Sequence, residues 1–183
     1  PIQGAPEFTA GLVEFSQGVV APLSGVKPDH GMMIPLGIVD SDRELAIVPL
    51  YLNTVFAEAP DPAQSYALGE QLRDYVATRP TQEKTVVLAG GGLSHWLGVP
   101  EEGRVNAVWD EAFIDRMIRG QGEVLAQMTN AEILRDAGNG GLEVNAWIAL
   151  AGAMPGCGGE KLFYEAVPEW ASGMGGVALT PDA

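Results

Sequence analysis

Residues 44–89 decide the fold, because two apolar runs in this stretch, 44–52 (ELAIVPLYL) and 84–89 (KTVVLA), flank a segment with the signals of a helix. Both runs are too uniformly apolar for strands with one wet face, and continuous apolar strands are typical of a sheet covered on both sides. A third run, 32–38 (MMIPLGI), precedes them and is also predicted to be a strand. We therefore expect an α/β fold with a mainly parallel central sheet between helical layers.

The segment between the two runs carries start and stop signals of a helix. Asp61 is suited to cap the first turn, Pro62 fits the first helical position, and Pro80 follows the end. A strand, a helix and a second strand in this order predict a βαβ unit. Apolar residues recur at helical spacing between the signals: Leu68, Leu72, Tyr75 and Val76.

The second half of the chain is predicted to be helical. Asn106 is suited to cap a helix that runs to about Arg119. Thr129 and Glu132 match a capping box, and Gly138 is a plausible stop for the helix that follows. One apolar stripe marks the first of these helices: Trp109, Phe113 and Met117.

A third helix is predicted over residues 141–153, which are apolar nearly all round. Such a helix should be buried. Glu143 in its first turn is the exception, because a carboxylate is buried only beside a compensating charge or metal. The alternative is an acid that the helix dipole favours near an N-terminus, which has no functional meaning.

Composition restricts the function classes. By its size, a chain of 183 residues is expected to be one domain, 1–183, or a large part of one, with 46% hydrophobic residues to build a core. Its net charge of -14 disfavours nucleic acid and anionic membrane surfaces as partners. No apolar run reaches the about 18 to 20 residues of a membrane span. The single cysteine, Cys157, cannot form an internal disulfide, so we expect a cytoplasmic protein.

Only two histidines occur, His30 and His95, and each is expected in a loop beside a strand. His95 follows the run 84–89 and three glycines, 90–92, which allow the backbone to approach a ligand closely. A lone loop histidine is more often structural than catalytic. Together with Glu143, the two histidines provide the ligands of a known type of iron site, in which two histidines and one carboxylate bind the metal. The number of ligands alone leaves the geometry of such a site open.

Six segments, taken together and in order, resemble the LigB-type class III extradiol ring-cleavage dioxygenases, which include the large subunits of protocatechuate 4,5-dioxygenases. The similarity runs from about residue 28 to the end of the chain. The segments are 29–36 (DHGMMIPL), 91–95 (GGLSH), 106–115 (NAVWDEAFID), 132–138 (EILRDAG), 141–144 (GLEV) with 152–154 (GAM), and 167–175 (VPEWASGMG).

The resemblance implies roles for three residues. His95 matches the family's catalytic histidine, an acid/base that does not bind the metal. Glu143 matches the carboxylate ligand of Fe(II), and His30 matches a histidine near the substrate. The family's two iron-binding histidines would lie in an N-terminal segment that this chain does not contain, so the resemblance favours these roles over a ligand triad of His30, His95 and Glu143.

The implied reaction is the opening of a catechol-type ring, such as that of protocatechuate or gallate, by O2 to a semialdehyde or related acid. An imidazole suits such chemistry because it takes and returns a proton near neutral pH. The family also implies an oligomer, in some members with a small partner subunit. The alternative function is a non-catalytic LigB-like partner or structural subunit that lacks the iron histidines.

Overall fold

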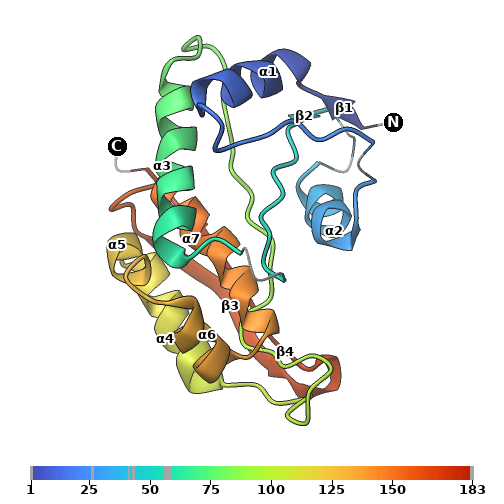
Figure 1. The fold of residues 1–183 in the computed structure, drawn as a ribbon, viewed down its shortest axis with the longest axis vertical. Coiled ribbons are helices and arrows are strands. Elements are labelled where there is room, and N and C mark those ends of the chain that lie inside the picture. The colour runs from blue at the N-terminus through green and yellow to red at the C-terminus, as the bar shows by residue number, and fades with distance from the viewer. Residues whose placement is uncertain (1, 26, 41, 43, 56–58, 182–183) are drawn as a thin grey trace.

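A computed structural model describes residues 2–25, 27–40, 42, 44–55 and 59–181 of the protein. It has a helical body with a long hairpin on one side and an N-terminal part whose helix α1 packs against α3 (Figure 1). The helices are α1 (Pro6–Phe15), α2 (His30–Val39), α3 (Pro62–Ala77), α4 (Ala107–Ile118), α5 (Gly122–Leu125), α6 (Asn130–Ala137) and α7 (Val144–Ala153), with short 3-10 helices η1 (Gly140–Glu143) and η2 (Pro168–Trp170). The strands are β1 (Gln3–Gly4), β2 (Ala46–Ile47), β3 (Gly159–Val167) and β4 (Ser172–Leu179).

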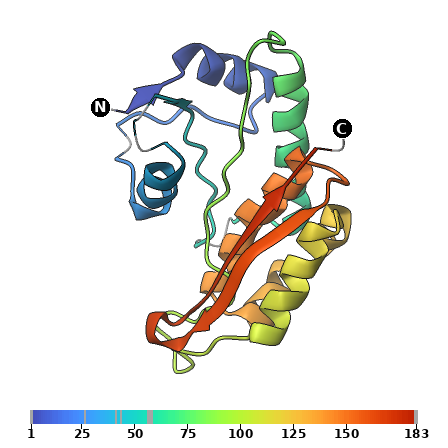
Figure 2. The ribbon, with the colours of Figure 1, turned by 180° about the vertical axis from the view of Figure 1, so that it is seen from behind.

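The expected α/β class is confirmed, since helices combine with a small parallel sheet. In that sheet β1 pairs with β2, with Gln3 opposite Ala46 and Gly4 opposite Ile47. A second sheet is the antiparallel hairpin β3–β4, which Figure 2 shows lying across α4 and α7. This hairpin was not predicted from the sequence. Its four glycines and its many half-exposed side chains hide the alternation by which strands are recognised.

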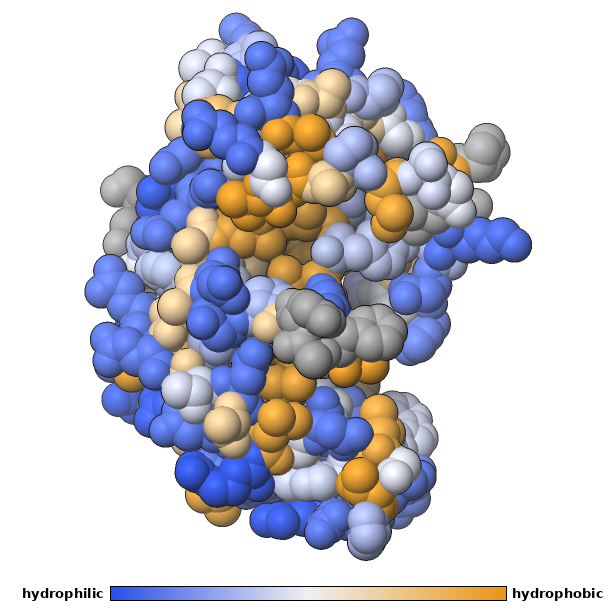
Figure 3. Space-filling view, in the orientation of Figure 1, coloured by the Kyte–Doolittle hydropathy of each residue, from blue (hydrophilic) through white to orange (hydrophobic). Residues whose placement is uncertain are grey.

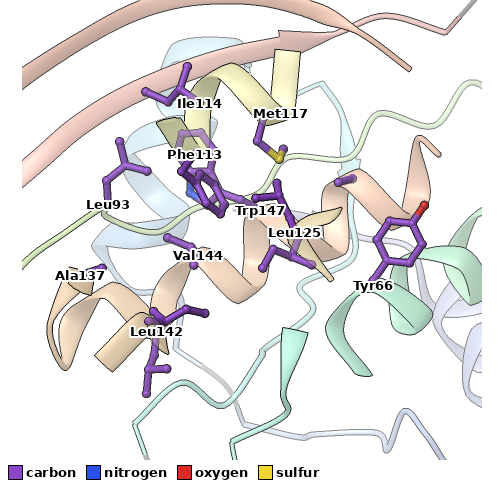
Figure 4. Packing of buried hydrophobic residues seen from close by; sticks show 13 residues of the cluster. Tyr66, Leu93, Phe113, Ile114, Met117, Leu125, Ala137, Leu142, Val144 and Trp147 are labelled. Carbon is purple, nitrogen blue, oxygen red and sulfur yellow. The ribbon is translucent and has the colours of Figure 1, made fainter. Parts of the chain in front are cut away.

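The core lies between α3, α4, α7 and the hairpin (Figure 4). Phe113 on α4 and Trp147 on α7 meet edge to face, with ring centroids 6.2 Å apart. Helices α3 and α7 pack so closely that a Cβ atom at Gly69 would collide with the backbone of Ala149, and one at Gly152 with the backbone of Tyr66. Glycine at these two positions therefore sets the distance between the two helices.

The helix predicted after Asp61 and the helices predicted in the second half are confirmed. Asp61 and Gln64 form a reciprocal capping box at the start of α3, and Thr129 and Glu132 form another at the start of α6. The Asn106 side chain accepts a hydrogen bond from the Trp109 amide of α4. The predicted helix 141–153 is present, but its first residues form η1, and α7 begins only at Val144.

The prediction of a strand over 32–38 is wrong, because these residues belong to α2. The Asp29 side chain caps α2 by accepting a hydrogen bond from the Met32 amide. A short apolar run does not by itself distinguish a strand from a buried helix. The capping residue before the run was the local signal for a helix.

The two other predicted strands are present only in part or not at all. Within 44–52 only β2 is paired, and Pro49 lacks the N–H group that would extend the ladder. Residues 84–89 are described, and no strand is assigned to them. Most of their side chains are open to solvent, with Val86 87% exposed, and only Val87 and Ala89 are partly buried. A βαβ unit with paired strands is therefore not formed by the described residues.

Candidate active site

The glycine run 90–92 is the point where the three predicted site segments meet. A Cβ atom at Gly90 would lie 3.1 Å from the carbonyl oxygen of Gly31, next to His30. One at Gly91 would lie 2.9 Å from Cβ of Glu143, and one at Gly92 would lie 2.9 Å from Cε1 of His95. Side chains at these positions would push the three segments apart. The glycines therefore have a packing role in addition to any conformational one.

Helix α7 and the 3-10 helix η1 before it hold the glycine run in place. The Gly92 amide donates a hydrogen bond of 2.6 Å to Oε2 of Glu143, and the Trp147 indole N–H donates one of 3.0 Å to the carbonyl oxygen of Gly91. Glu143 is half-buried, which is less than its apolar neighbours in sequence led us to expect. Within the described residues Oε1 of Glu143 accepts no hydrogen bond, so this oxygen is available to a ligand.

His95 is buried, with 6% of its surface exposed, and is fixed from several directions. Its amide donates to the carbonyl oxygen of Ala137 at 2.8 Å, and its own carbonyl oxygen accepts from the Gly140 amide at 3.1 Å. The ring packs against Gly140, where a Cβ atom would collide with the imidazole. The loop predicted for His95 is confirmed, although no strand precedes it at 84–89, and the loop predicted for His30 is wrong, because His30 is the first residue of α2.

The hydrogen bond at Nδ1 sets the tautomer of His95. Nδ1 lies 2.7 Å from the carbonyl oxygen of Leu93. A carbonyl oxygen only accepts, so Nδ1 carries the proton in this contact, and the neutral ring keeps an unprotonated Nε2. The geometry thus leaves Nε2 as a proton acceptor.

A fully buried carboxylate, Asp110 on α4, supports the His95 segment from the core side. It accepts hydrogen bonds from the Ser94 amide at 2.8 Å, the Ser94 hydroxyl at 2.9 Å and the Tyr164 hydroxyl at 2.8 Å. Burial raises the pKa of Asp110, whereas these hydrogen bonds and the nearby His95 act in the opposite direction. Burial and the bond to Asp110 in turn raise the pKa of Tyr164.

A cavity of about 460 Å³ adjoins this site, a size that suits a small organic ligand. Glu143 and Gly140 line it, together with the apolar side chains of Leu97, Leu134 and Leu142. His95 is not in the lining and lies directly behind Gly140. The structure therefore places Glu143 at the cavity and His95 one layer behind its wall, whereas His30 is exposed at the first residue of α2.

Glu143 is the one predicted metal ligand in this chain. Among the described residues no group of three or more His, Cys, Asp or Glu side chains is placed to hold a metal ion. The ligand triad of His30, His95 and Glu143, which the residue count alone allowed, is thus not assembled. Among the described residues, the predicted site offers a metal ion one ligand atom, the carboxylate oxygen Oε1 of Glu143.

Comparison with known proteins decides the family. A family model described as the catalytic LigB subunit of aromatic ring-opening dioxygenase matches residues 2–175. The chain belongs to the LigB family. Its LigB relatives include a gallate dioxygenase of Pseudomonas putida, which is 30% identical over 69% of this chain and 38% of that protein.

Two further relatives are named 2,3-dihydroxyphenylpropionate/2,3-dihydroxicinnamic acid 1,2-dioxygenase. The one from Klebsiella pneumoniae is 24% identical over 84% of this chain and 64% of its own length. The one from Pseudomonas putida is 25% identical over 97% of this chain and 71% of its own length. This LigB chain therefore spans between about two fifths and seven tenths of these relatives.

Asp110 belongs to the site, although no role was predicted for it from the sequence, where it lies in the segment 106–115. A signal was present, because Asp110 shares the helical spacing of Phe113 and Met117, so an acid stands in the apolar stripe of α4. An acid at such a position is buried and requires donors, which Ser94 and Tyr164 provide.

Proposed function

We propose that the protein carrying this chain is a non-haem Fe(II) extradiol dioxygenase that opens a catechol-type ring with O2. The observation that carries the proposal is the glycine run 90–92, against which both His95 and Glu143 pack. Support also comes from the LigB family and from relatives named for gallate and for 2,3-dihydroxyphenylpropionate. Extradiol cleavage breaks the ring C–C bond beside a hydroxyl-bearing carbon, and both atoms of O2 enter the ring-opened acid.

Glu143 is the residue that would bind the metal. Oε2 is oriented by the Gly92 amide, so Oε1 is the oxygen left to coordinate. A hydrogen bond from a backbone amide to a metal-binding carboxylate fixes its orientation. Iron(II) supplies a Lewis acid that favours ionisation of a bound phenol and leaves coordination positions open for the diol and O2.

His95 would move a proton during the reaction. With Nδ1 donating to Leu93, Nε2 accepts a proton from the second hydroxyl of the diol and returns it at ring opening. The His95 imidazole and Glu143 both contact Gly92. Gly140 lies between the imidazole and the cavity, so a diol bound at Glu143 would reach Nε2 once Gly140 moves aside. His30 is proposed to contact the substrate, because its neighbour Gly31 packs against Gly90 of the glycine run.

Two substitutions test the proposal. His95→Ala should keep iron and lose most turnover, because it removes the proton acceptor and no ligand. Glu143→Ala should lower the iron content itself. The exposed Glu160→Ala serves as the matched control and should change neither quantity. Metal analysis and catechol-dependent O2 uptake check the outcome, and full turnover by His95→Ala would contradict the role of His95.

The alternative is a LigB chain that acts as a partner or structural subunit without catalysis. It is favoured by one observation, namely that the described residues bring no three metal ligands together. Iron titration separates the two functions. If the protein is a dioxygenase, the wild type binds iron(II) and Glu143→Ala binds it with lower affinity. If it is a structural subunit, the wild type and Glu143→Ala bind iron(II) equally weakly.

We also propose that the protein forms an oligomer, one form of which includes a small partner subunit. We propose a cytoplasmic location as well. The location rests on the single cysteine, which is suited to a reducing compartment. None of the helices in the described part of the chain is both long and apolar enough to cross a membrane. Sedimentation of the purified protein and cell fractionation test the two proposals.

A further inference from the structure

The Asp110 carboxylate makes an unusual set of contacts with the residue before His95. Its Oδ1 accepts the Ser94 amide N–H, and its Oδ2 accepts the Ser94 hydroxyl. The Ser94 hydroxyl oxygen in turn accepts the Asn106 amide at 2.7 Å. Ser94 is thereby fixed through its backbone and its side chain by one acid that is 0% exposed.

The Ser94 amide belongs to the same peptide unit as the carbonyl group of Leu93. A peptide unit is planar, and its N–H and C=O groups point in opposite directions. In this unit the N–H group points to Asp110, and the carbonyl oxygen accepts the proton of His95 Nδ1 at 2.7 Å. Asp110 and the imidazole are therefore joined end to end through one peptide bond.

Hydrogen bonds in such a chain strengthen one another. A carboxylate that accepts the N–H group polarises the amide, so its carbonyl oxygen becomes a stronger acceptor for the next donor. The segment has little freedom to turn away, because the Leu93 amide and the Ser94 carbonyl are both paired with the backbone of Gly173 on β4. Gly173 must be glycine, since a Cβ atom there would collide with the Asp110 carboxylate.

We propose that Asp110 is a positioning residue that acts on His95 through the Leu93–Ser94 peptide bond, holding the proton on Nδ1 and leaving Nε2 as the acceptor. This relay resembles a direct aspartate–histidine pair in its effect, with a peptide unit inserted between the two side chains. Its importance for catalysis rests on the proposed function, whereas its effect on the tautomer of His95 does not.

The tautomer is measured by nitrogen NMR of the imidazoles at about pH 8.5, which is about two units above the pKa of histidine in model peptides. The chain has two histidines, and the spectrum of His30→Gln assigns them. The relay predicts a single Nδ1–H form for His95 in the wild type. In Asp110→Ala, His95 should become a mixture of the Nδ1–H and Nε2–H forms. In Asp110→Asn the asparagine still offers Ser94 a neutral, weaker acceptor, so the fraction of the Nε2–H form should be smaller.

Two controls separate the relay from general stability. Tyr164→Phe removes a donor from the same carboxylate and leaves the peptide contacts in place, so His95 should keep its single tautomer. Asp115→Ala removes an exposed acid of the same helix, which pairs with Arg119, and should also have no effect. The relay is wrong if His95 keeps a single Nδ1–H form in Asp110→Ala. If Asp110→Ala does not fold, the same result in Asp110→Asn rules the relay out.

Kinetics distinguish the relay from the proposed function. In the active protein Asp110→Ala should lower kcat by about 100-fold with little change in KM or iron content, because only the proton acceptor is misplaced. Asp110→Asn should restore part of the loss. If the wild type shows no catechol-dependent O2 uptake, the dioxygenase proposal fails, and the NMR result still decides whether the relay exists.

Discussion

Gly92 is the residue on which the candidate site depends most directly. Its amide binds Glu143, and its missing side chain leaves room for the imidazole of His95. His95 and Glu143 were predictable as site candidates from the sequence, because a histidine after a glycine run and an acid in an apolar helix are both unusual. Their meeting at Gly92 was not, since it depends on how a loop and a helix 51 residues apart pack together.

A methyl group at position 92 should displace His95. In Gly92→Ala the new Cβ atom would lie 2.9 Å from Cε1 of His95 and 3.0 Å from the Ser172 hydroxyl oxygen, which is closer than carbon atoms normally approach. We expect a loss of about 1–3 kcal/mol in the free energy of unfolding and a much larger loss in turnover. Urea unfolding and O2 uptake measure the two effects.

Gly37→Ala is the matched control for Gly92→Ala. A Cβ atom at Gly37 meets no atom within 4 Å, and the residue lies in α2. Alanine there should leave both quantities unchanged or raise stability slightly. Equal turnover in the two alanine variants would contradict the packing role of Gly92.

Asp110 should give the protein a characteristic pH dependence. Burial raises the pKa of Asp110 above that of an unfolded aspartate, so the folded state holds this proton more readily. Its contribution to stability is fully present below about pH 4 and is lost as the pH rises through the raised folded value. Asp110→Asn does not titrate, so the difference in Tm between wild type and variant should be largest at acid pH and shrink toward neutrality. A difference that grows with pH would contradict this sign.

Among the secondary-structure elements, those with local end signals were predictable from the sequence. Helices α3 and α6 begin with capping boxes, and α4 begins with an asparagine cap, so a few neighbouring residues determine their first turns. The strands depend on partners far away in the sequence. Residues 84–89 have strand composition and no strand partner among the described residues, whereas β3 and β4 pair despite a weak pattern. Pairing is a property of the tertiary structure, which local composition does not encode.

The contact between α3 and α7 should fail when its glycines are replaced. In Gly69→Ala the added Cβ atom would collide with backbone atoms of Ala149, Ala153 and Gly152, which cannot rotate away. We expect a loss of about 1–3 kcal/mol or more, measured by urea unfolding. The exposed Asp74→Ala on the same helix is the control and should stay within about 0.5 kcal/mol of the wild type. Equal stability of the two variants would show that the helices are free to separate.

On the scale of the whole molecule, apolar side chains remain open on the face seen in Figure 3, including a hollow near its centre. Large apolar residues on the unpaired segments are strongly exposed, among them Val55 at 82% and Val86 at 87%. Covering such side chains with another apolar surface would be favourable.

The exposed surface predicts binding of the dye ANS by the 183-residue chain. Val86→Lys should lower the dye fluorescence and leave the thermal midpoint nearly unchanged, because Val86 has few neighbours to lose. Lys84→Ala provides a control on the same segment and should not lower the fluorescence. A large drop in the midpoint of Val86→Lys would show that Val86 is packed in the folded chain.

The most direct test of the central claim is the stoichiometry of O2 uptake. The protein carrying this chain, loaded with iron(II), is given a limited amount of gallate or 2,3-dihydroxyphenylpropionate, and O2 consumption is followed together with the loss of aromatic absorbance. Ring cleavage at the Gly92 site predicts equimolar use of O2 and diol in the wild type and almost none in His95→Ala at equal iron content. No diol-dependent uptake, or the same uptake with and without His95, would contradict the claim.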